Sequence, residues 1–243
     1  MLFRSLHNIC AAILNGCTNI MQLVLPHHCL LCGSPNSSGV LCAPCHASLP
    51  WHDGPQCGQC ALPTTAGETC GHCLQTPPAF DRTIATLRYE FPLDVLIQRL
   101  KYHHQLALAP LLGNALAELA SMSASRPDVL IPMPLHPSRL RERGFNQAQE
   151  LARIVARKLD IPLLVQGAER IRATPPQVGL PWKERAKSVR GAFSSTVDLS
   201  GKHVAILDDV MTTGTSLHEL SLALRRQGAM EISTWVVART LPA

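Results

Sequence analysis

The sequence predicts an α/β domain with a parallel sheet, preceded by a small cysteine-rich module. Beyond about residue 80, short apolar runs alternate with stretches of helical periodicity, and this alternation is typical of parallel sheets. Before residue 80, eight cysteines form four CxxC pairs in a segment rich in proline and glycine. We therefore expect an N-terminal helix over 1–26, a cysteine-rich module over 27–80 and the α/β domain over 81–243.

The overall composition is that of a globular protein. The chain has 243 residues, 46% of them hydrophobic and 16% charged, which is enough for one large domain and a small one. Aromatic residues make up only 4%, which argues against a stacking platform for single-stranded nucleic acid. After residue 80 there are 21 Lys and Arg against 15 Asp and Glu, so we expect any polyanionic ligand to bind this part.

The first 26 residues contain one basic residue, Arg4, and a short apolar stretch interrupted by asparagine and glycine. This stretch falls short of the roughly 18 apolar residues that a spanning helix needs. We expect a short amphipathic helix, no membrane span and a cytoplasmic protein.

The four CxxC pairs predict zinc. Nine residues separate the first pair from the second, and nine separate the third from the fourth, which is a short internal repeat. Two thiolates in a CxxC turn can both reach one tetrahedral zinc, and two such turns complete its shell. Four disulfides would not persist in a reducing cytosol, and a redox CxxC is usually solitary and begins a helix. We expect two structural zinc ions, bound by Cys29, Cys32, Cys42, Cys45, Cys57, Cys60, Cys70 and Cys73.

The short spacers favour zinc pairing between adjacent CxxC turns, although an interleaved pairing has the same spacing. With all eight thiolates bound to zinc, the formal charge of +5 would fall to near +1. The apparent basicity of the chain therefore depends on its metal content.

The elements after residue 80 follow from periodicity and capping residues. Pro92 begins a helix that runs through Leu100, and a longer helix covers 105–120. The run DVLIPMP forms a buried strand, and Asn146 caps the next helix, with Gln149 at its third position. Short strands are expected at 163–165 and 168–172, and 173–189 has no clear period. The run HVAIL is a buried strand, a helix covers 216–227, and ISTWVVAR completes the sheet.

The run VAILDDVMTTGTSL places two acids and a hydroxyl-rich loop between a strand and a helix. Ligands bind at the carboxyl ends of strands in parallel sheets, where Asp208 and Asp209 are expected. Their side chains point to opposite sides, so each can accept hydrogen bonds from a sugar diol. The loop from Thr212 to Ser216 leads into the helix, whose amides favour an anion. Together these features predict a ribose 5-phosphate site.

This run resembles the phosphoribosyl pyrophosphate (PRPP) binding motif of type I phosphoribosyltransferases, which has four apolar residues, two acids and then TTG with further hydroxyls. The stretch IPMPLHPSRLRERGFNQAQELA, with RLKYHH and the cysteine pairs upstream, is similar to the ComF competence-protein family, also called GntX-like. The resemblance extends from Leu25 onward. It implies a type I phosphoribosyltransferase-like parallel sheet flanked by helices, with an N-terminal double zinc ribbon.

The resemblance also implies roles for individual residues. Asp208 and Asp209 would hold the ribose hydroxyls, and magnesium would bridge these hydroxyls and the pyrophosphate. Lys101, Arg139 and Arg143 would be nearby cations, although Arg139 and Arg143 also fit a solvated charge run. The 5-phosphate would be bound by Thr212, Thr213, Gly214, Thr215 and Ser216.

The segment 173–193 corresponds to a loop that closes over the site in the wider group. Lys183 and Arg185 would stabilise the leaving pyrophosphate there, and Ser188 stands where asparagine is expected. The alternative for this segment is a flexible basic linker.

Three functions are compatible with these features. The first is a phosphoribosyltransferase, for which the sequence offers no motif that binds an acceptor. The second, implied by the ComF resemblance, is a factor for DNA uptake in natural transformation that binds PRPP or single-stranded DNA, with a DNA-uptake helicase as a further partner. The third is a regulator that senses PRPP. The sequence does not define the oligomeric state.

Overall fold

The computed structural model describes residues 27–36, 39–173 and 189–242. The chain divides into two compact units, Met1–Leu49 and Pro50–Ala243, and each is described by itself. The division falls between the second and third CxxC pairs, so two cysteine pairs belong to each unit. The expected domain boundaries after residues 26 and 80 stay predictions, and the expected N-terminal helix lies outside the described residues.

The smaller unit is built around two turns that carry cysteines. Strands β1 (His27–His28) and β2 (Pro35–Asn36) pair antiparallel, and helix α2 (Ala43–Ala47) follows. Gly33 between the strands has a φ of 73°, in the left-handed region that glycine adopts without steric cost. Its amide donates a hydrogen bond of 2.9 Å to the carbonyl oxygen of Cys29, which closes the first CxxC turn.

The larger unit contains a four-stranded sheet in the order β3-β8-β7-β4. All three strand pairs are parallel, which confirms the predicted fold class. The central strands are buried on both faces and therefore read as continuous apolar runs in the sequence. The edge strand β3 was not predicted, because its run RTIATLR is neither continuously apolar nor strictly alternating. The strands are β3 (Arg82–Arg88), β4 (Val129–Pro132), β7 (His203–Met211) and β8 (Glu231–Arg239).

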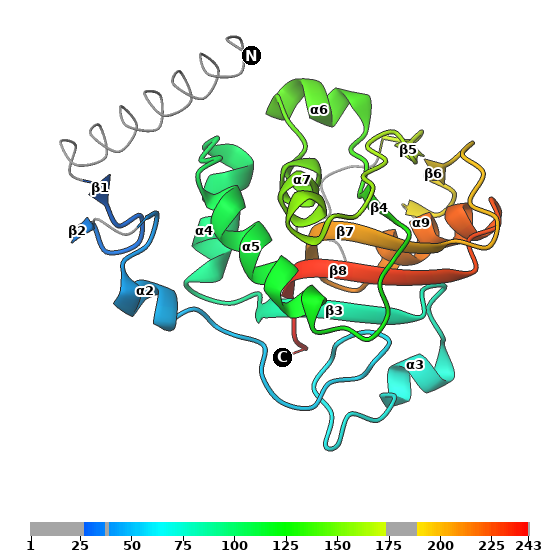
Figure 1. Cartoon of the computed structure of the whole chain (residues 1–243), viewed down its shortest axis with the longest axis horizontal. Coiled ribbons are helices and arrows are strands. Elements are labelled where there is room, and N and C mark those ends of the chain that lie inside the picture. Colours follow the sequence, from blue (N-terminus) through cyan, green and yellow to red (C-terminus); the bar gives the residue numbers. More distant parts are fainter. Residues whose placement is uncertain (1–26, 37–38, 174–188, 243) are drawn as a thin grey trace, which may run out of the picture. The chain divides into compact units, whose positions relative to one another are not determined.

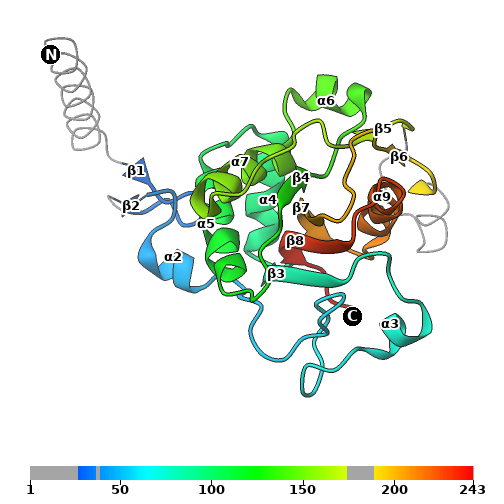
Figure 2. The same cartoon turned by 45° about the vertical axis from the view of Figure 1, so that its right-hand side comes forward.

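Helices cover both faces of this sheet. Helices α4, α5 and α7 lie on one face and α9 lies on the other (Figures 1 and 2). A Cβ at Gly113 of α5 would lie 3.0 Å from Cγ2 of Ile154 in α7, so glycine allows these two helices to pack closely. The helices are α4 (Leu93–Tyr102), α5 (Leu108–Ser121), α7 (Gln147–Leu159) and α9 (Thr215–Arg225).

Three short elements differ from the sequence prediction. Helix α6 (Pro137–Arg143) was not predicted; it begins with proline, and the His136 side chain accepts a hydrogen bond from the Ser138 amide. Of the strand expected at 163–165, only Leu163 forms a bridge, to Leu130. The strand expected at 168–172 is β5 (Glu169–Arg170), which pairs antiparallel with β6 (Phe193–Ser194) outside the main sheet.

The segment with the third and fourth CxxC pairs packs into the core of the larger unit. Cys57, Cys60 and Cys73 are buried in the same apolar cluster as Phe80 and Met211. The short helix α3 (Gly71–Gln75) supplies the last cysteine of this group. The part of the cysteine-rich segment that carries the third and fourth CxxC pairs therefore belongs to the core next to β7. Among the helices of the described segments, none has the length and apolarity needed to cross a bilayer.

Candidate functional site

The eight predicted zinc ligands form two groups of four. In each group the sulfur atoms lie within 4.8 Å of one another, with Cys29, Cys32, Cys42 and Cys45 in one group and Cys57, Cys60, Cys70 and Cys73 in the other. This is the adjacent pairing favoured by the spacers, and the interleaved alternative is excluded. Four thiolates at one point are the ligand set of a structural zinc ion.

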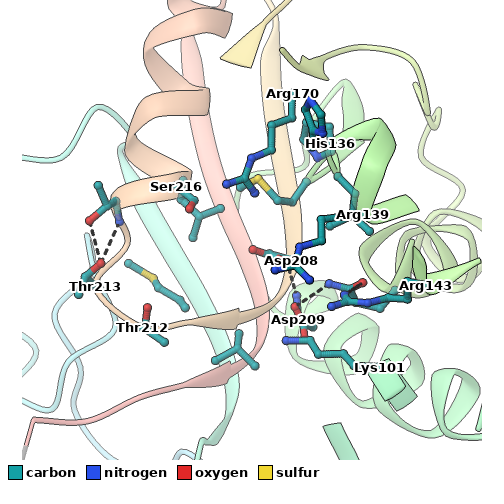
Figure 3. Close-up of a pocket in the computed structure, with 18 of the residues that line it drawn as sticks. Lys101, His136, Arg139, Arg143, Arg170, Asp208, Asp209, Thr212, Thr213 and Ser216 are labelled. Carbon is teal, nitrogen blue, oxygen red and sulfur yellow. Dashed lines mark hydrogen bonds and ion pairs between the residues drawn. The ribbon is translucent and has the colours of Figure 1, made fainter. Parts of the chain in front are cut away.

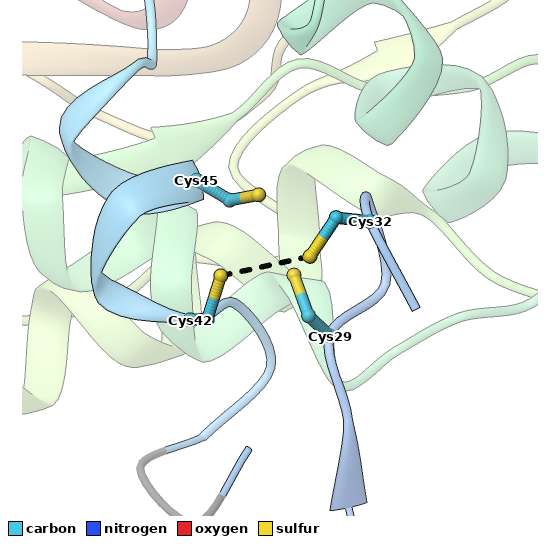
Figure 4. Close-up of side chains that lie close together, drawn as sticks. All are labelled: Cys29, Cys32, Cys42 and Cys45. Carbon is cyan, nitrogen blue, oxygen red and sulfur yellow. Dashed lines mark hydrogen bonds between the residues drawn. The ribbon is translucent and has the colours of Figure 1, made fainter. Parts of the chain in front are cut away.

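The first cysteine group joins the turn after β1 to helix α2, and its four side chains point toward one another (Figure 4). The sulfur atoms of Cys32 and Cys42 are 3.7 Å apart. Burial would raise the pKa of Cys29, but hydrogen bonds from backbone amides outweigh it and lower the pKa to about 6. The neighbouring Cys42 sulfur raises the pKa of Cys45 to about 12. Backbone donors thus favour one thiolate, and a divalent cation would offset the repulsion that opposes the others.

The second cysteine group has the same arrangement in a more buried setting. The Cys70 amide donates to the Cys57 sulfur at 3.3 Å, and the Cys60 and Cys70 sulfur atoms are 3.5 Å apart. Burial would raise the pKa of Cys57, but backbone hydrogen bonds lower it to about 7. Burial raises the pKa of Cys60 to about 11. Both groups therefore fit structural zinc.

A cleft of about 810 Å³ lies at the carboxyl ends of the strands in the larger unit. It is lined by the end of β7, the loop that enters α9, and side chains from α4, α6, α7 and β5. Figure 3 shows these groups facing one another. Every predicted PRPP-binding residue lines this cleft, namely Lys101, Arg139, Arg143, Asp208, Asp209, Thr212, Thr213, Gly214, Thr215 and Ser216.

The two aspartates at the end of β7 have different environments. Asp209 is 3% exposed, and its carboxylate forms an ion pair with the Lys101 ammonium. Asp208 is partly exposed, and its Oδ1 accepts a hydrogen bond of 2.8 Å from the Asp209 amide. Lys101 thus pairs with Asp209 rather than Asp208, and the two carboxyl groups also interact with each other.

Burial and charge give these aspartates opposite pKa shifts. Burial raises the pKa of Asp208 well above its usual value, and the neighbouring Asp209 charge raises it further. Burial would also raise the pKa of Asp209, but the Lys101 ammonium outweighs this and lowers it. The two aspartates in turn raise the pKa of Lys101 against the effect of burial. Asp209 is therefore a structural charge, whereas Asp208 is the acceptor that lacks a cationic partner at hydrogen-bond distance in the described residues.

Gln147 and Arg143 extend the network around Asp209. The Asn146 side chain accepts from the Ala148 amide and donates to the Met133 carbonyl oxygen, both at 3.0 Å. This cap fixes the start of α7 against the end of β4, as the sequence predicts for Asn146. The next side chain, Gln147, donates to Asp209 at 3.4 Å and accepts from the Arg143 guanidinium at 2.6 Å.

The loop between β7 and α9 presents hydroxyl groups at the start of a helix. Gly214 has a φ of 78° and immediately precedes α9. The hydroxyls of Thr213 and Thr215 lie 2.7 Å apart, and the first turn of α9 contains no acidic residue. A helix start with hydroxyl donors and no nearby acid attracts an anion.

Cations lie across the cleft from this loop. Arg139 forms an ion pair of 2.9 Å with Glu142, which agrees with a solvated charge run, and it also lines the cleft. The Arg143 guanidinium lies 5.3 Å from the centre of the Tyr102 ring. Arg170 enters from β5, and burial lowers its pKa, while the charge of Asp208 acts to raise it.

Sequence reasoning missed several side chains of this cleft. Arg170 belongs to a two-residue strand without a motif, and it reaches the cleft because β5 pairs with β6. Gln147 directly follows the cap, and only its distance from Asp209 reveals its role. Tyr89 and His136 also line the cleft and carry no pattern of their own. Lys183, Arg185 and Ser188 lie outside the described residues.

Two family models match this chain. Residues 20–74 match the double zinc ribbon domain family, and residues 146–241 match the phosphoribosyl transferase domain family. Two solved structures are also similar. One is a glutamine PRPP amidotransferase from B. subtilis, at 23% identity and a TM-score of 0.38 over 54% of this chain and 26% of that chain. The other is a purine phosphoribosyltransferase from Pyrococcus horikoshii, at 20% identity and a TM-score of 0.34 over 54% of this chain and 85% of that chain.

Relatives match along most of the chain. Competence protein F of Haemophilus influenzae is 36% identical over 220 residues, which cover 87% of this chain and 90% of that protein. The DNA utilization protein YhgH of Escherichia coli K12 is 34% identical over 90% of this chain and 100% of that protein. Competence protein ComFC of Bacillus subtilis is 26% identical over 93% of this chain and 83% of that protein. The chain therefore belongs to the ComF family of competence proteins, with a double zinc ribbon and a phosphoribosyltransferase-type domain.

Proposed function

We propose that this protein binds PRPP with magnesium in the cleft and acts in DNA uptake or use as a phosphoribosyltransferase with an unknown acceptor. The observation that carries the proposal is the position of Asp208 between a hydroxyl-bearing helix start and a group of cations (Figure 3). The role in DNA use rests on the relatives named competence protein F and DNA utilization protein.

The ribose 5-phosphate part of PRPP fits the side of the cleft next to α9. The partly exposed carboxylate of Asp208 can accept hydrogen bonds from a ribose hydroxyl. The loop 212–216 offers hydroxyls and amides at a helix start, where a phosphate monoester is favoured by both hydrogen bonds and the helix dipole. The loop is short, which suits one phosphate rather than a triphosphate.

The pyrophosphate part fits the opposite side. Four cationic side chains, Lys101, Arg139, Arg143 and Arg170, line the cleft with only the two aspartates as carboxylates. Lys101 is paired with Asp209 and Arg139 with Glu142, and the lining of the cleft still carries more cationic than anionic side chains. Guanidinium groups bind phosphate oxygens in a bidentate manner that lysine cannot reproduce.

Magnesium suits the same donor set. Mg²⁺ binds one or two carboxylates together with phosphate oxygens and keeps several waters. Asp209 is held by Lys101, so Asp208 is the carboxylate that would hold the ion. When bound, magnesium would neutralise negative charge that develops on the pyrophosphate.

The residues of the chain contribute to transfer by position and charge. Departure of pyrophosphate from C1 leaves positive character on the ribose and adds negative charge to the leaving group, which Arg139 and Arg170 would stabilise. Asp208 and Asp209 place negative charge near the ribose. No protein nucleophile is needed for this step, and the acceptor supplies the attacking atom.

One observation favours a second candidate function, the binding of single-stranded DNA. Tyr102 is 60% exposed at the cleft, and the Arg143 guanidinium lies over its ring. An exposed aromatic ring beside a cation can stack a base and neutralise the adjacent phosphate. A PRPP sensor without turnover would use the same cleft.

Release of pyrophosphate from PRPP separates these functions. We expect release when one member of a panel of nucleobases, amines and DNA oligonucleotides is added with magnesium. Binding of PRPP without release for any acceptor would favour the sensor. Binding of labelled DNA that weakens steeply with salt, and is lost in Tyr102→Ala, would favour the DNA-binding function.

A further inference from the structure

Arg239, the last residue of β8, lies between the second cysteine group and the loop that enters α9. It is 4% exposed, and its register partner in β7 is Met211. A buried guanidinium is costly unless its donors are satisfied. Its hydrogen bonds therefore reveal which parts of the structure it holds together.

The two ends of the guanidinium bind different segments. Nε donates a hydrogen bond of 2.8 Å to the carbonyl oxygen of Cys60. Nη1 donates to the Met211 carbonyl oxygen at 3.0 Å and also to the carbonyl oxygen of Thr212. A third carbonyl oxygen, that of Thr240, accepts from Nη1 at 2.7 Å. One side chain thus links a CxxC turn to the backbone of the hydroxyl-rich loop.

These bonds also set the direction of the loop amides. In a trans peptide the C=O group and the following N–H group point in opposite directions. Because Arg239 holds the carbonyl oxygens of Met211 and Thr212, the amides of Thr212 and Thr213 are fixed on the side opposite to Arg239. Fixed amides in this loop can donate to a phosphate in addition to the amides at the start of α9.

Further contacts anchor both the CxxC turn of Cys57 and Cys60 and the loop in the core of the larger unit. The Thr83 amide in β3 donates to the Gly58 carbonyl oxygen at 2.9 Å. A Cβ at Gly214 would lie 2.6 Å from Met211 Cε and 3.6 Å from Phe80 Cζ, so the loop packs directly on the core that contains Cys57, Cys60 and Cys73. The CxxC turn of Cys57 and Cys60 and the loop before α9 therefore pack on the same core.

We propose that Arg239 is a positioning residue that makes the phosphate-binding loop depend on the second cysteine group. When the four sulfur atoms of that group hold zinc, the Cys60 carbonyl is fixed and orients Arg239, which in turn orients the loop. Loss of this metal would loosen the loop without removing any ligand-binding side chain. The first cysteine group belongs to the other compact unit and therefore serves as the control. The inference rests on the proposed binding of phosphate by loop 212–216.

The internal repeat supplies a matched pair of variants. Cys70 and Cys42 occupy the same place in their groups: each precedes a short helix, with ψ of 156° and 158°, and each is of intermediate exposure. Cys70→Ser should raise the hydrogen-exchange rate of the backbone amides of 211–216 in the ligand-free protein about tenfold, because the free energy of local opening falls. Cys42→Ser should leave that rate unchanged. Equal effects of the two variants, or no effect of Cys70→Ser despite loss of one zinc, would overturn the proposal.

Arg239 is tested with a second matched pair, Arg239→Gln and Arg225→Gln. Arg225 also donates to several backbone carbonyls, including that of Ala229 at 3.2 Å, but it lies at the far end of α9. Arg239→Gln should weaken binding of ribose 5-phosphate about tenfold, the equivalent of roughly one or two lost hydrogen bonds, and leave binding of pyrophosphate within about twofold. Arg239→Lys should restore part of the affinity for ribose 5-phosphate. Arg225→Gln should leave the affinity for both ligands unchanged.

The two readouts separate the two proposals. If wild-type protein binds no phosphate ligand but Cys70→Ser still loosens the loop, the proposed function fails and the link through Arg239 stands. If PRPP binds and Arg239→Gln weakens ribose 5-phosphate and pyrophosphate equally, the link fails and the proposed function stands.

Discussion

Replacing Asp209 with asparagine should destabilise the ligand-free protein, whereas the same change at Asp208 should stabilise it. Asp209 is 3% exposed and paired with Lys101, so the asparagine variant leaves the buried ammonium without its counter-ion. Removing one partner of a buried pair costs about 3–5 kcal/mol. The Lys101 side chain is 20% exposed, so water relieves part of the loss and the lower end of this range applies.

This loss converts into a measurable change of Tm. For a unit the size of Pro50–Ala243, each 1 kcal/mol changes Tm by about 2–4 °C. Asp209→Asn should therefore lower Tm by about 6–12 °C. Asp208 carries a charge that burial and Asp209 both oppose, and Asp208→Asn should raise Tm by about 2–4 °C, since relief of strain at a functional site commonly yields about 1 kcal/mol.

The pH dependence provides a control for this reasoning. Because the folded-state pKa of Asp208 is raised, the cost of its charge is present at high pH and disappears as pH falls through that pKa. The advantage of Asp208→Asn should therefore shrink on acidification. Asp209 has a lowered pKa, so its stabilisation is present above the unfolded value and is lost as pH falls through the folded one. Differential scanning calorimetry of both variants from pH 8 to pH 4 measures these changes in Tm. Equal shifts of Tm in both variants would refute the opposite pKa shifts assigned to Asp208 and Asp209.

Three further outcomes are expected. Arg170→Gln should weaken pyrophosphate binding about tenfold, since a charged hydrogen bond contributes about 1.5–3 kcal/mol, and leave ribose 5-phosphate binding unchanged; calorimetric titration of each ligand checks this, and the reverse selectivity would remove Arg170 from the pyrophosphate side. Gly214→Ala should lower Tm and weaken ribose 5-phosphate binding, because a Cβ there meets Met211 Cε at 2.6 Å and the φ of 78° is strained for alanine; wild-type behaviour would mean that the loop adapts freely. Metal analysis should find two zinc ions per chain, falling to one in Cys70→Ser and in Cys42→Ser, and a folded protein without metal would contradict the zinc assignment.

Much of this architecture could be predicted from sequence, for identifiable physical reasons. The central strands are apolar on both faces, and the cap at Asn146 is a local signal, so β7, β8 and the start of α7 were found. Strand β3 was missed because its first three residues are only partly buried and its run has no continuous apolar stretch. The spacing favoured adjacent zinc pairing but left an interleaved pairing open, and the grouping of the sulfur atoms decides between them.

The cleft was predicted only in part. Asp208, Asp209 and the loop 212–216 are contiguous, and their order carries the signal. Arg170 and Gln147 approach them from distant segments, and no short-range pattern encodes that approach. Arg239 is more instructive, because it reads as the last residue of an apolar strand and only its hydrogen bonds to Cys60 and Met211 distinguish it.

The central claim, that the cleft binds a phosphorylated ribose through Asp208 and the loop before α9, is tested most directly by calorimetric titration of PRPP with magnesium. We expect one PRPP bound per chain in the wild type and no detectable binding in Asp208→Asn, a variant whose Tm should be at least that of the wild type. PRPP binding of equal strength in both proteins, or no binding in the wild type at millimolar PRPP, would contradict the claim.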